Sequence, residues 1–195
     1  MFHDANRALQ DRFGSRALAD RLVATWHRTA FTAEDAAFIA HRPFFFLATA
    51  DAAGAPDCSF KGGDPGFVRV LAPDLLAFPD YDGNGMFKSL GNIAANPRVG
   101  LLFIAIGSTE MPARLRVNGT ASVAEDDPLL ADFPGAQMLV RVRPEHIFPN
   151  CPRYIPGFEP TGLSPYTPRT GVAPLEPEWK SREALRDVVP PRRGV

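Results

Sequence analysis

The 195-residue sequence contains few residues of the kinds that mark metal-binding and disulfide-rich proteins. Its two cysteines, Cys58 and Cys151, form no Cys-x-x-Cys motif, which argues against a disulfide framework. Its four histidines have no metal-ligand spacing such as His-Glu-x-x-His. The formal net charge of −1 provides no field that would attract nucleic acid or an anionic membrane. We therefore expect no metal site and no nucleic-acid or membrane partner.

Long apolar runs are also missing. No stretch approaches the roughly 20 apolar residues of a membrane span. The first ten residues, MFHDANRALQ, carry charges where a signal peptide needs an apolar core. We therefore expect a cytoplasmic protein. The overall composition, 45% hydrophobic and 22% charged, is typical of a globular protein, and we expect one domain over residues 1–195.

Two counts are high, because the chain has 15 phenylalanines and 20 prolines. Residues 1–42 favour helices, since Leu18, Leu22 and Trp26 recur every four residues and form one apolar stripe. Thr32 and Asp35 have the spacing of a capping box at the start of a further short helix. Many prolines lie after residue 143, so we expect residues 149–195 to form a mostly extended, proline-rich tail.

Residues 43–148 have the patterns of short strands joined by hairpin-length turns. Within 114–123 the side chains alternate, which predicts that Val117 lies inside and Arg116 outside a curved sheet. The sequence therefore predicts a mainly β protein with flanking helices, as an antiparallel barrel or sandwich. The expected strands are 44–50, 57–63, 67–71, 75–78, 99–106, 114–123 and 137–143.

The stretch DYDGNGMFKSLGNIAANP, residues 80–97, interrupts this β pattern. Met86, Leu90 and Ile93 lie three or four residues apart, which predicts a helix over 86–95 that ends before Asn96-Pro97. A glycine-rich loop that leads into a helix N-terminus points backbone N–H groups toward one spot. The loop at 82–85 is therefore a candidate anion site.

Three segments carry donors suited to one phosphate or carboxylate. Lys88 and Ser89 fall in the first turn of the predicted helix, Lys61 lies in SFKGGDPG, and Arg114 and Arg116 share one face of a predicted strand. Each feature alone is ordinary, as a turn, a solvated lysine or outward-facing arginines in an antiparallel sheet. Only their co-occurrence favours an anion site.

Three stretches together resemble the pyridoxamine 5'-phosphate oxidase-like, FMN-binding split-barrel family. They are FLATADAAGAPDCSFKGG, FPDYDGNGMFKSLGNIAANPRVGLLF and LRVNGTA, and the resemblance extends over roughly residues 40–150. The sequence is most similar to the predicted flavin-nucleotide-binding branch of that family. The resemblance implies a split β-barrel homodimer that binds FMN at its interface.

The resemblance also implies site residues. Lys88 matches the phosphate-binding arginine of the family, the amides and glycines of 82–85 cradle the phosphate end, and Cys151 and Arg153 lie on the substrate side. The full set implied for FMN is Ser59, Phe60, Lys61, Gly62, Tyr81, Asp82, Asn84, Lys88, Ser89, Arg114 and Arg116. No catalytic side chain is expected, because the redox chemistry belongs to the flavin.

The sequence departs from the vitamin oxidases at Ser59, Ser89 and Asp64, where those enzymes have an arginine and two lysines. We therefore expect an FMN-dependent oxidoreductase that acts on a small organic substrate and is not a true pyridoxamine phosphate oxidase. One alternative is a non-catalytic flavin-binding or carrier protein, or a dimeric module whose site has lost its ligand. A haem protein ranks last, because the chain has four histidines and no haem motif.

Overall fold

A computed structural model describes residues 1–105, 113–157, 159–173 and 175–191. The predicted N-terminal helices are confirmed as α1 (Asp4–Arg12), α2 (Arg16–Trp26) and α3 (Ala33–Ala40). The predicted capping box is also confirmed, because the Asp35 amide donates to Thr32 Oγ1 at 3.1 Å and the Thr32 amide donates to Asp35 Oδ2 at 3.0 Å.

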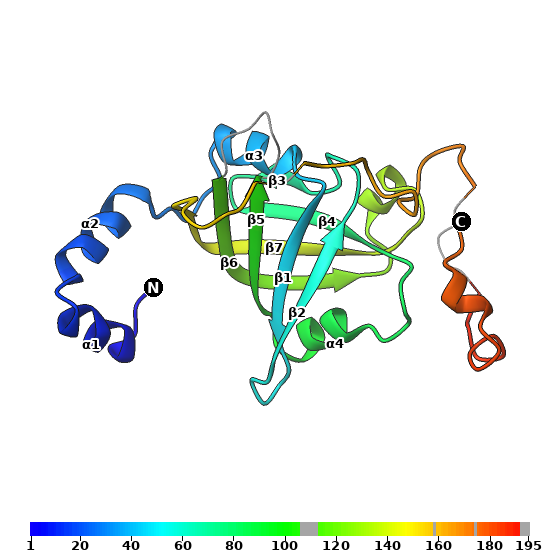
Figure 1. Ribbon diagram of the computed structural model, residues 1–195, viewed down its shortest axis with the longest axis horizontal. Coiled ribbons are helices and arrows are strands. Elements are labelled where there is room, and N and C mark those ends of the chain that lie inside the picture. Colours follow the sequence, from blue (N-terminus) through cyan, green and yellow to red (C-terminus); the bar gives the residue numbers. More distant parts are fainter. Residues whose placement is uncertain (106–112, 158, 174, 192–195) are drawn as a thin grey trace.

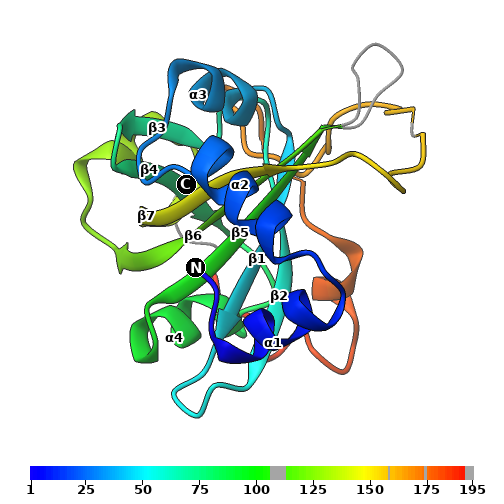
Figure 2. The ribbon, with the colours of Figure 1, turned by 90° about the vertical axis from the view of Figure 1, so that its left-hand side faces the viewer.

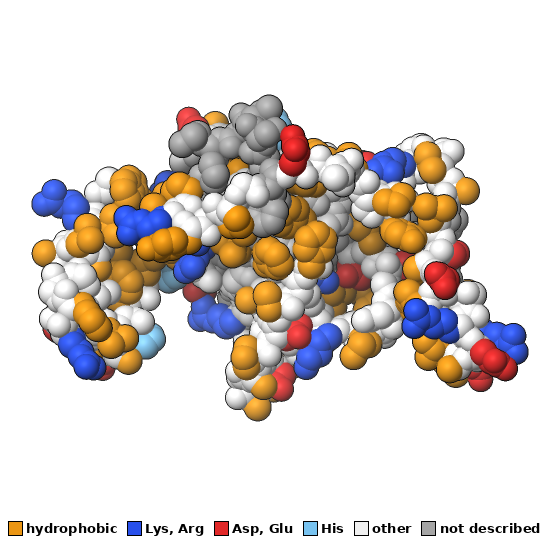
Figure 3. All heavy atoms as spheres, in the orientation of Figure 1, with side chains coloured by type: hydrophobic (Ala, Val, Ile, Leu, Met, Phe, Trp, Pro, Cys, Tyr) orange, Lys and Arg blue, Asp and Glu red, His pale blue; other side chains and the backbone are white. Residues whose placement is uncertain are grey.

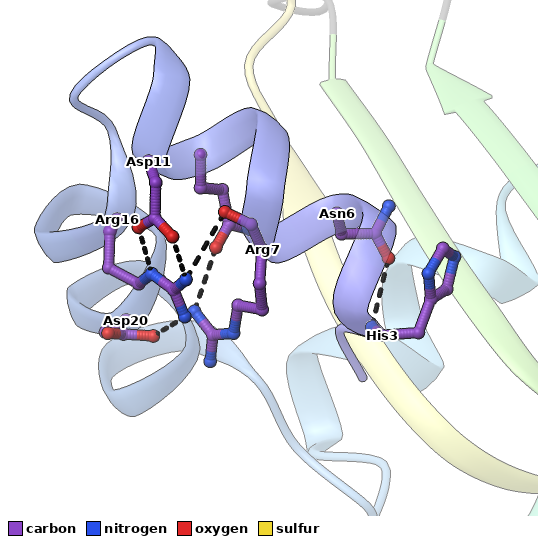
Figure 4. A network of polar contacts seen from close by, with 7 residues as sticks. His3, Asn6, Arg7, Asp11, Arg16 and Asp20 are labelled. Atoms are coloured by element: carbon purple, nitrogen blue, oxygen red, sulfur yellow. Dashed lines mark hydrogen bonds and ion pairs between the residues drawn. The ribbon is translucent and has the colours of Figure 1, made fainter.

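The helices α1 and α2 form an arm beside the barrel rather than a layer on it (Figures 1 and 2). The predicted stripe of Leu18, Leu22 and Trp26 is exposed, and no residue of either helix is buried. Ion pairs hold the arm together, with Arg7 bound to Asp20 at 2.6 Å and Arg16 bound to Asp11 (Figure 4). Amphipathic periodicity thus predicted the helix but not what its apolar face packs against.

The sheet has seven antiparallel strands in the order β2-β1-β5-β6-β7-β4-β3. Each predicted strand is present, although Ile106 at the end of one of them lies outside the described residues. The last strand continues to Asn150, two residues past the expected end of the barrel. The strands are β1 (Phe44–Ala50), β2 (Pro56–Gly62), β3 (Arg69–Ala72), β4 (Leu75–Tyr81), β5 (Arg98–Ala105), β6 (Ala113–Ala124) and β7 (Ala136–Asn150).

The sheet curls into a split antiparallel barrel with flanking helices, which confirms the predicted fold class (Figure 1). Its two longest strands, β6 and β7, pair along their length and connect the half that contains β1, β2 and β5 to the half that contains β3 and β4. The predicted alternation of β6 is confirmed, because Val117 is fully buried and Arg116 is exposed. Phe45 packs edge-on against Phe78 in the core, with ring centroids 4.9 Å apart.

The predicted helix at 86–95 is α4 (Lys88–Ala95), which begins two residues later than expected. Leu90 and Ile93 are buried against the barrel, but Met86 lies outside the helix and is 71% exposed. The Asn92 side chain donates to Thr49 Oγ1 at 3.0 Å and fixes the helix on β1. The helix α4 also contacts the edge strand β2.

The described residues after β7 are mostly in coil and turns, as predicted, and include one short 3₁₀ helix, η2 (Glu178–Ser181). A second 3₁₀ helix, η1 (Pro128–Asp132), precedes β7. The C-terminal segment lies on the opposite side of the barrel from α1 and α2 (Figure 1). Within the described ranges, no helix has the length and apolar character needed to cross a membrane.

Candidate functional site

The loop before α4 has an unusual backbone. Asn84 Oδ1 accepts from the Met86 amide at 3.0 Å, and Gly85 has a φ of +73°. Phe87, at the N-cap of α4, adopts a left-handed conformation with a φ of +47°, which L-residues rarely adopt. Among the described residues, no side chain caps α4, so its first-turn N–H groups are left for other acceptors.

A cavity of about 690 Å³ opens beside this loop. One wall comes from the inner face of β2 and the end of β4, and the base comes from the loop and the start of α4. Seven of the predicted FMN-binding residues line it: Ser59, Lys61, Tyr81, Asp82, Asn84, Lys88 and Ser89. The fold therefore gathers two of the three predicted donor segments in one hollow.

Two hydroxyl groups meet in the wall of this cavity. The oxygens of Ser59, on β2, and Ser89, in the first turn of α4, lie 2.9 Å apart. Ser89 is only 5% exposed. The pair joins the start of the helix to the edge strand, and each hydroxyl retains capacity to accept a further hydrogen bond.

A charged pair lies deeper in the site. Lys61 Nζ is 3.9 Å from a carboxylate oxygen of Asp80. Burial raises the pKa of Asp80 above its usual value, while Lys61 opposes the rise. Burial also raises the pKa of the neighbouring Tyr81 to about 12, so its hydroxyl stays protonated at neutral pH. The site thus offers an ammonium and a phenol as hydrogen-bond donors.

Residues 31–155 match the sequence profile of the family described as pyridoxamine 5'-phosphate oxidase. The chain belongs to this family. No curated protein matches the chain.

Several solved structures have folds similar to that of this chain. A protein from Lactobacillus delbrueckii, provisionally assigned as such an oxidase, is 26% identical and has a TM-score of 0.48, over 62% of this chain and 95% of its own. An FMN-binding protein from Syntrophomonas wolfei is 10% identical with a TM-score of 0.45, over 74% and 96%. The haem storage protein HutZ from Vibrio cholerae is 22% identical with a TM-score of 0.43, over 57% and 88%.

In this member of the pyridoxamine 5'-phosphate oxidase family, the third predicted donor segment does not join the cavity. Arg116 lies over the ring of Phe148, with its guanidinium carbon 6.0 Å from the centroid. Arg114 donates to the Cys151 carbonyl. The even positions of β6, which include both arginines, lie on the face opposite the buried odd positions, and neither arginine lines the cavity of its own chain. Their place at an FMN site between two subunits stays a prediction.

The other predicted residues of this family member lie on the same outer side or at its margin. Phe60 is 62% exposed and stacks on Phe44, with centroids 5.2 Å apart, and Gly62 lies opposite Phe44 in the register. Cys151 and Arg153 contact each other near Arg114, where the Arg153 amide donates to Cys151 Sγ at 3.4 Å. None of these residues lines the 690 Å³ cavity.

The sequence reasoning missed the cavity wall that lies outside the range matched by the family. Trp179 and Lys180, on η2, line the cavity with Leu185 and the run 188–191. Lys180 pairs with Asp82, and Lys180 Nζ is also 3.2 Å from a Glu176 oxygen. The available signal was a tryptophan next to a lysine within the proline-rich tail.

Proposed function

We propose that the chain is an FMN-binding flavoprotein whose cofactor lies in the 690 Å³ cavity, with its phosphate at the loop before α4 and its ring toward β2 and β4. The observation that carries this proposal is the meeting of Lys61, Lys88 and the buried Ser89 hydroxyl beside an uncapped helix N-terminus. A dianionic phosphate suits the helix dipole, the ammonium of Lys88 and the loop amides.

The residues present fit such a cofactor in size and chemistry. The volume falls within the roughly 300–1,000 Å³ of small-molecule sites. Lys61 and the protonated Tyr81 hydroxyl can donate to carbonyl oxygens of a ring. When bound, the flavin would supply the hydride and electron transfer, and the chain would hold it, orient it and exclude water.

We further propose an oxidoreductase reaction on a small organic substrate other than pyridoxamine phosphate. Ser59 and Ser89 stand where the resemblance places cations of the vitamin oxidases, and here they bond to each other. A non-catalytic flavin carrier would use the same binding site, so an experiment must distinguish it from an oxidoreductase. Reduction of the bound flavin by NADPH supports the oxidoreductase, whereas a bound flavin inert to reductants supports the carrier.

A haem function has less support than a flavin. None of the four histidines, all of which lie in the described ranges, lines the cavity. Neutral imidazole is the usual nitrogen ligand for haem iron in proteins. The cavity instead offers ammonium, hydroxyl and phenol donors, which suit phosphate and flavin oxygens.

The proposal includes a homodimer with FMN at its interface. The outer face of β1, β2 and β5 carries an apolar patch, which we define as Phe44, Phe46, Phe60 and Leu102 (Figure 3). Phe46 lies opposite both Phe60 and Leu102 in the register, so the patch is continuous across three strands. Phe60 is exposed and the other three residues are partly exposed, and a continuous apolar patch of this kind fits a second copy of the chain.

Arg116 and Arg114 border this apolar patch, because they lie opposite Leu102 and Ile104 on β5. Arg114 Nε and Asn150 Oδ1 are buried without a hydrogen-bond partner in the described part of the chain. A second copy packed on the patch would supply hydrogen-bond partners for these two atoms. It would also bring its own Arg114 and Arg116 toward the cavity of the first copy. This arrangement accounts for arginines that lie outside the cavity of their own chain.

The test is the visible spectrum of protein purified from cells, followed by mass identification of the compound released on heating. A flavin spectrum and a released mass equal to that of FMN are expected. Colourless protein whose melting temperature does not rise when FMN is added would contradict the proposal.

The proposal also places the protein in the cytoplasm, which agrees with its two exposed cysteines, Cys58 and Cys151, both free of a disulfide.

A further inference from the structure

The C-terminal segment Glu176–Pro191, which we name the cover, forms a wall of the cavity although it lies beyond the residues matched by the family. Its cavity-lining side chains are mainly apolar: Trp179, Leu185, Val188, Val189, Pro190 and Pro191. The wall across the cavity, from β2, β4 and α4, is mainly polar, although Leu90 also lines it. The cavity is therefore lined by two chemically different walls.

Two ion pairs hold the tail on the barrel. The Lys180 ammonium pairs with Asp82, which directly precedes the glycine-rich loop, and the Lys180 side chain is only 11% exposed. Arg169 binds Asp64 through two hydrogen bonds of 2.6 Å. Both contacts are charge-assisted, so specific anchors, rather than a loose apolar contact, hold the tail and its cover on the barrel.

The ammonium of Lys180 stays charged in this position. Burial lowers its pKa, but the hydrogen bonds to Asp82 and Glu176 together with the negative charges of these two carboxylates raise it by more, so the pKa lies above the usual value. Lys180 Nζ also lies 5.9 Å from the centroid of the Trp179 ring. The pair with Asp82 therefore anchors η2 at the residue next to Trp179.

We propose that the cover is a ligand-binding element in which Trp179 packs against the planar ring system of the bound ligand. The Lys180–Asp82 pair acts as a positioning pair that keeps the cover closed. A planar aromatic group fits between an apolar wall that carries an indole and a polar wall that supplies donors. This inference rests on the proposed function, since FMN is the planar ligand used to test it.

Opening the cover should speed release of FMN. We expect Lys180→Asp to raise the dissociation rate of FMN about tenfold, the scale of one charge-assisted hydrogen bond. Trp179→Ala should raise it similarly without disturbing the ion pair. The charge exchange Lys180→Asp with Asp82→Lys should bring the rate back toward that of the wild type, because it restores the pair in reverse. Arg143→Asp, which breaks an exposed ion pair with Asp74, is the matched control and should leave the rate unchanged.

A second measurement reports the cover without any ligand. The chain has two tryptophans, so Trp26→Phe leaves Trp179 as the sole tryptophan. In that background acrylamide should quench Trp179 weakly, and Lys180→Asp should make quenching stronger. Added FMN should protect Trp179 further in the protein with an intact ion pair.

The outcomes separate the two proposals. Strong quenching of Trp179 with the ion pair intact would contradict the role of the cover in ligand binding. An FMN dissociation rate that neither Lys180→Asp nor Trp179→Ala changes would contradict it too. Neither result would contradict the proposal that the chain binds FMN. A closed cover in a protein that binds no FMN would overturn the proposed function and the ligand role of the cover with it. If the effects of Lys180→Asp and Asp82→Lys on the FMN dissociation rate were additive, the pair would have no positioning role.

Discussion

Ser59 and Ser89 lie 30 residues apart in the sequence, yet their hydroxyl oxygens are 2.9 Å apart. The contact joins the edge strand β2 to the first turn of α4 beside the candidate phosphate loop. Each hydroxyl can donate one hydrogen bond and accept others. The pair therefore links the two walls that would hold the phosphate end of the cofactor.

Ser89→Ala is predicted to weaken FMN binding about 5- to 10-fold, because one hydroxyl donor to an anion is lost and Ser59 loses its partner. Ser89→Thr retains the hydroxyl and should bind more tightly than Ser89→Ala. Quenching of FMN fluorescence during titration measures both affinities. Equal FMN affinities for wild type and Ser89→Ala would show that the Ser89 hydroxyl does not contribute to FMN binding.

Local pattern was enough to predict much of the fold. The alternation of β6 could be interpreted because one side of the strand is buried and the other is not, so Val117 and Arg116 could only lie on opposite faces. The capping box at Thr32 depends on residues three apart, which the sequence contains directly. The helix α4 was predicted correctly from Leu90 and Ile93, but Met86 was wrongly included in it. The helix begins after Met86 because Phe87, at its N-cap, adopts a left-handed conformation.

Long-range contacts could not be predicted in the same way. The Lys180–Asp82 pair spans 98 residues, and a coil segment has no periodicity that would specify its partner. Alternation also places Arg114 and Arg116 on one face without telling whether that face meets a cavity, solvent or another chain. Lys61 and Lys88 therefore line one cavity as the sequence predicted, whereas the arginines lie outside the cavity of their own chain and their place at the cofactor stays a prediction.

Phe60→Asp is predicted to convert the proposed dimer to monomers at micromolar protein concentration, because it places a charge at the exposed residue of the apolar patch. Analytical ultracentrifugation measures the change. Phe13→Asp is the matched control, because Phe13 is also exposed but lies on the N-terminal arm. A wild-type monomer that binds FMN tightly would contradict the placement of the cofactor at an interface.

Gly119→Ala is predicted to destabilise the fold strongly. Gly119 faces the bulge in the β6–β7 pairing, and an added Cβ would meet the Arg143 carbonyl oxygen at 2.0 Å, a contact with backbone that cannot rotate away. Gly91→Ala, inside α4, meets nothing within 4 Å and should stabilise the protein by about 0.5–1 kcal/mol. Urea unfolding of both variants is the measurement. A tolerated Gly119→Ala would show that the register around the bulge is wrong.

Acidification is predicted to weaken the junction between the N-terminal arm and the barrel. His27 Nε2 and His146 Nδ1 are 2.8 Å apart, next to the paired backbones of Arg28 and Ile147. The pKa of His146 lies below 6.5, first because of burial, and then because of the positive charges of the amino terminus, His27 and Arg98, which outweigh Glu145. The unfolded chain then binds more protons than the folded chain just below pH 6.5, so stability falls as the pH drops through 6.5 toward the lowered pKa.

His146→Gln should remove this part of the pH dependence. Melting temperatures at about pH 7.5 and about pH 5 measure it, and the wild type should lose more on acidification than the variant. His41→Gln, whose ring bonds to the Ala37 carbonyl in its own helix, is the control. The same loss in wild type and His146→Gln would contradict the assignment.

Lys88 tests the central claim most directly, since the claim is that the loop before α4 holds the phosphate of FMN. The measurement is the dissociation constant of FMN and of riboflavin, which lacks the phosphate, for wild type and Lys88→Ala. We predict that Lys88→Ala weakens FMN about tenfold or more and leaves riboflavin nearly unchanged, as expected for a lost charge-assisted contact. An equal loss for both ligands, or no loss for either, would contradict a phosphate site at α4.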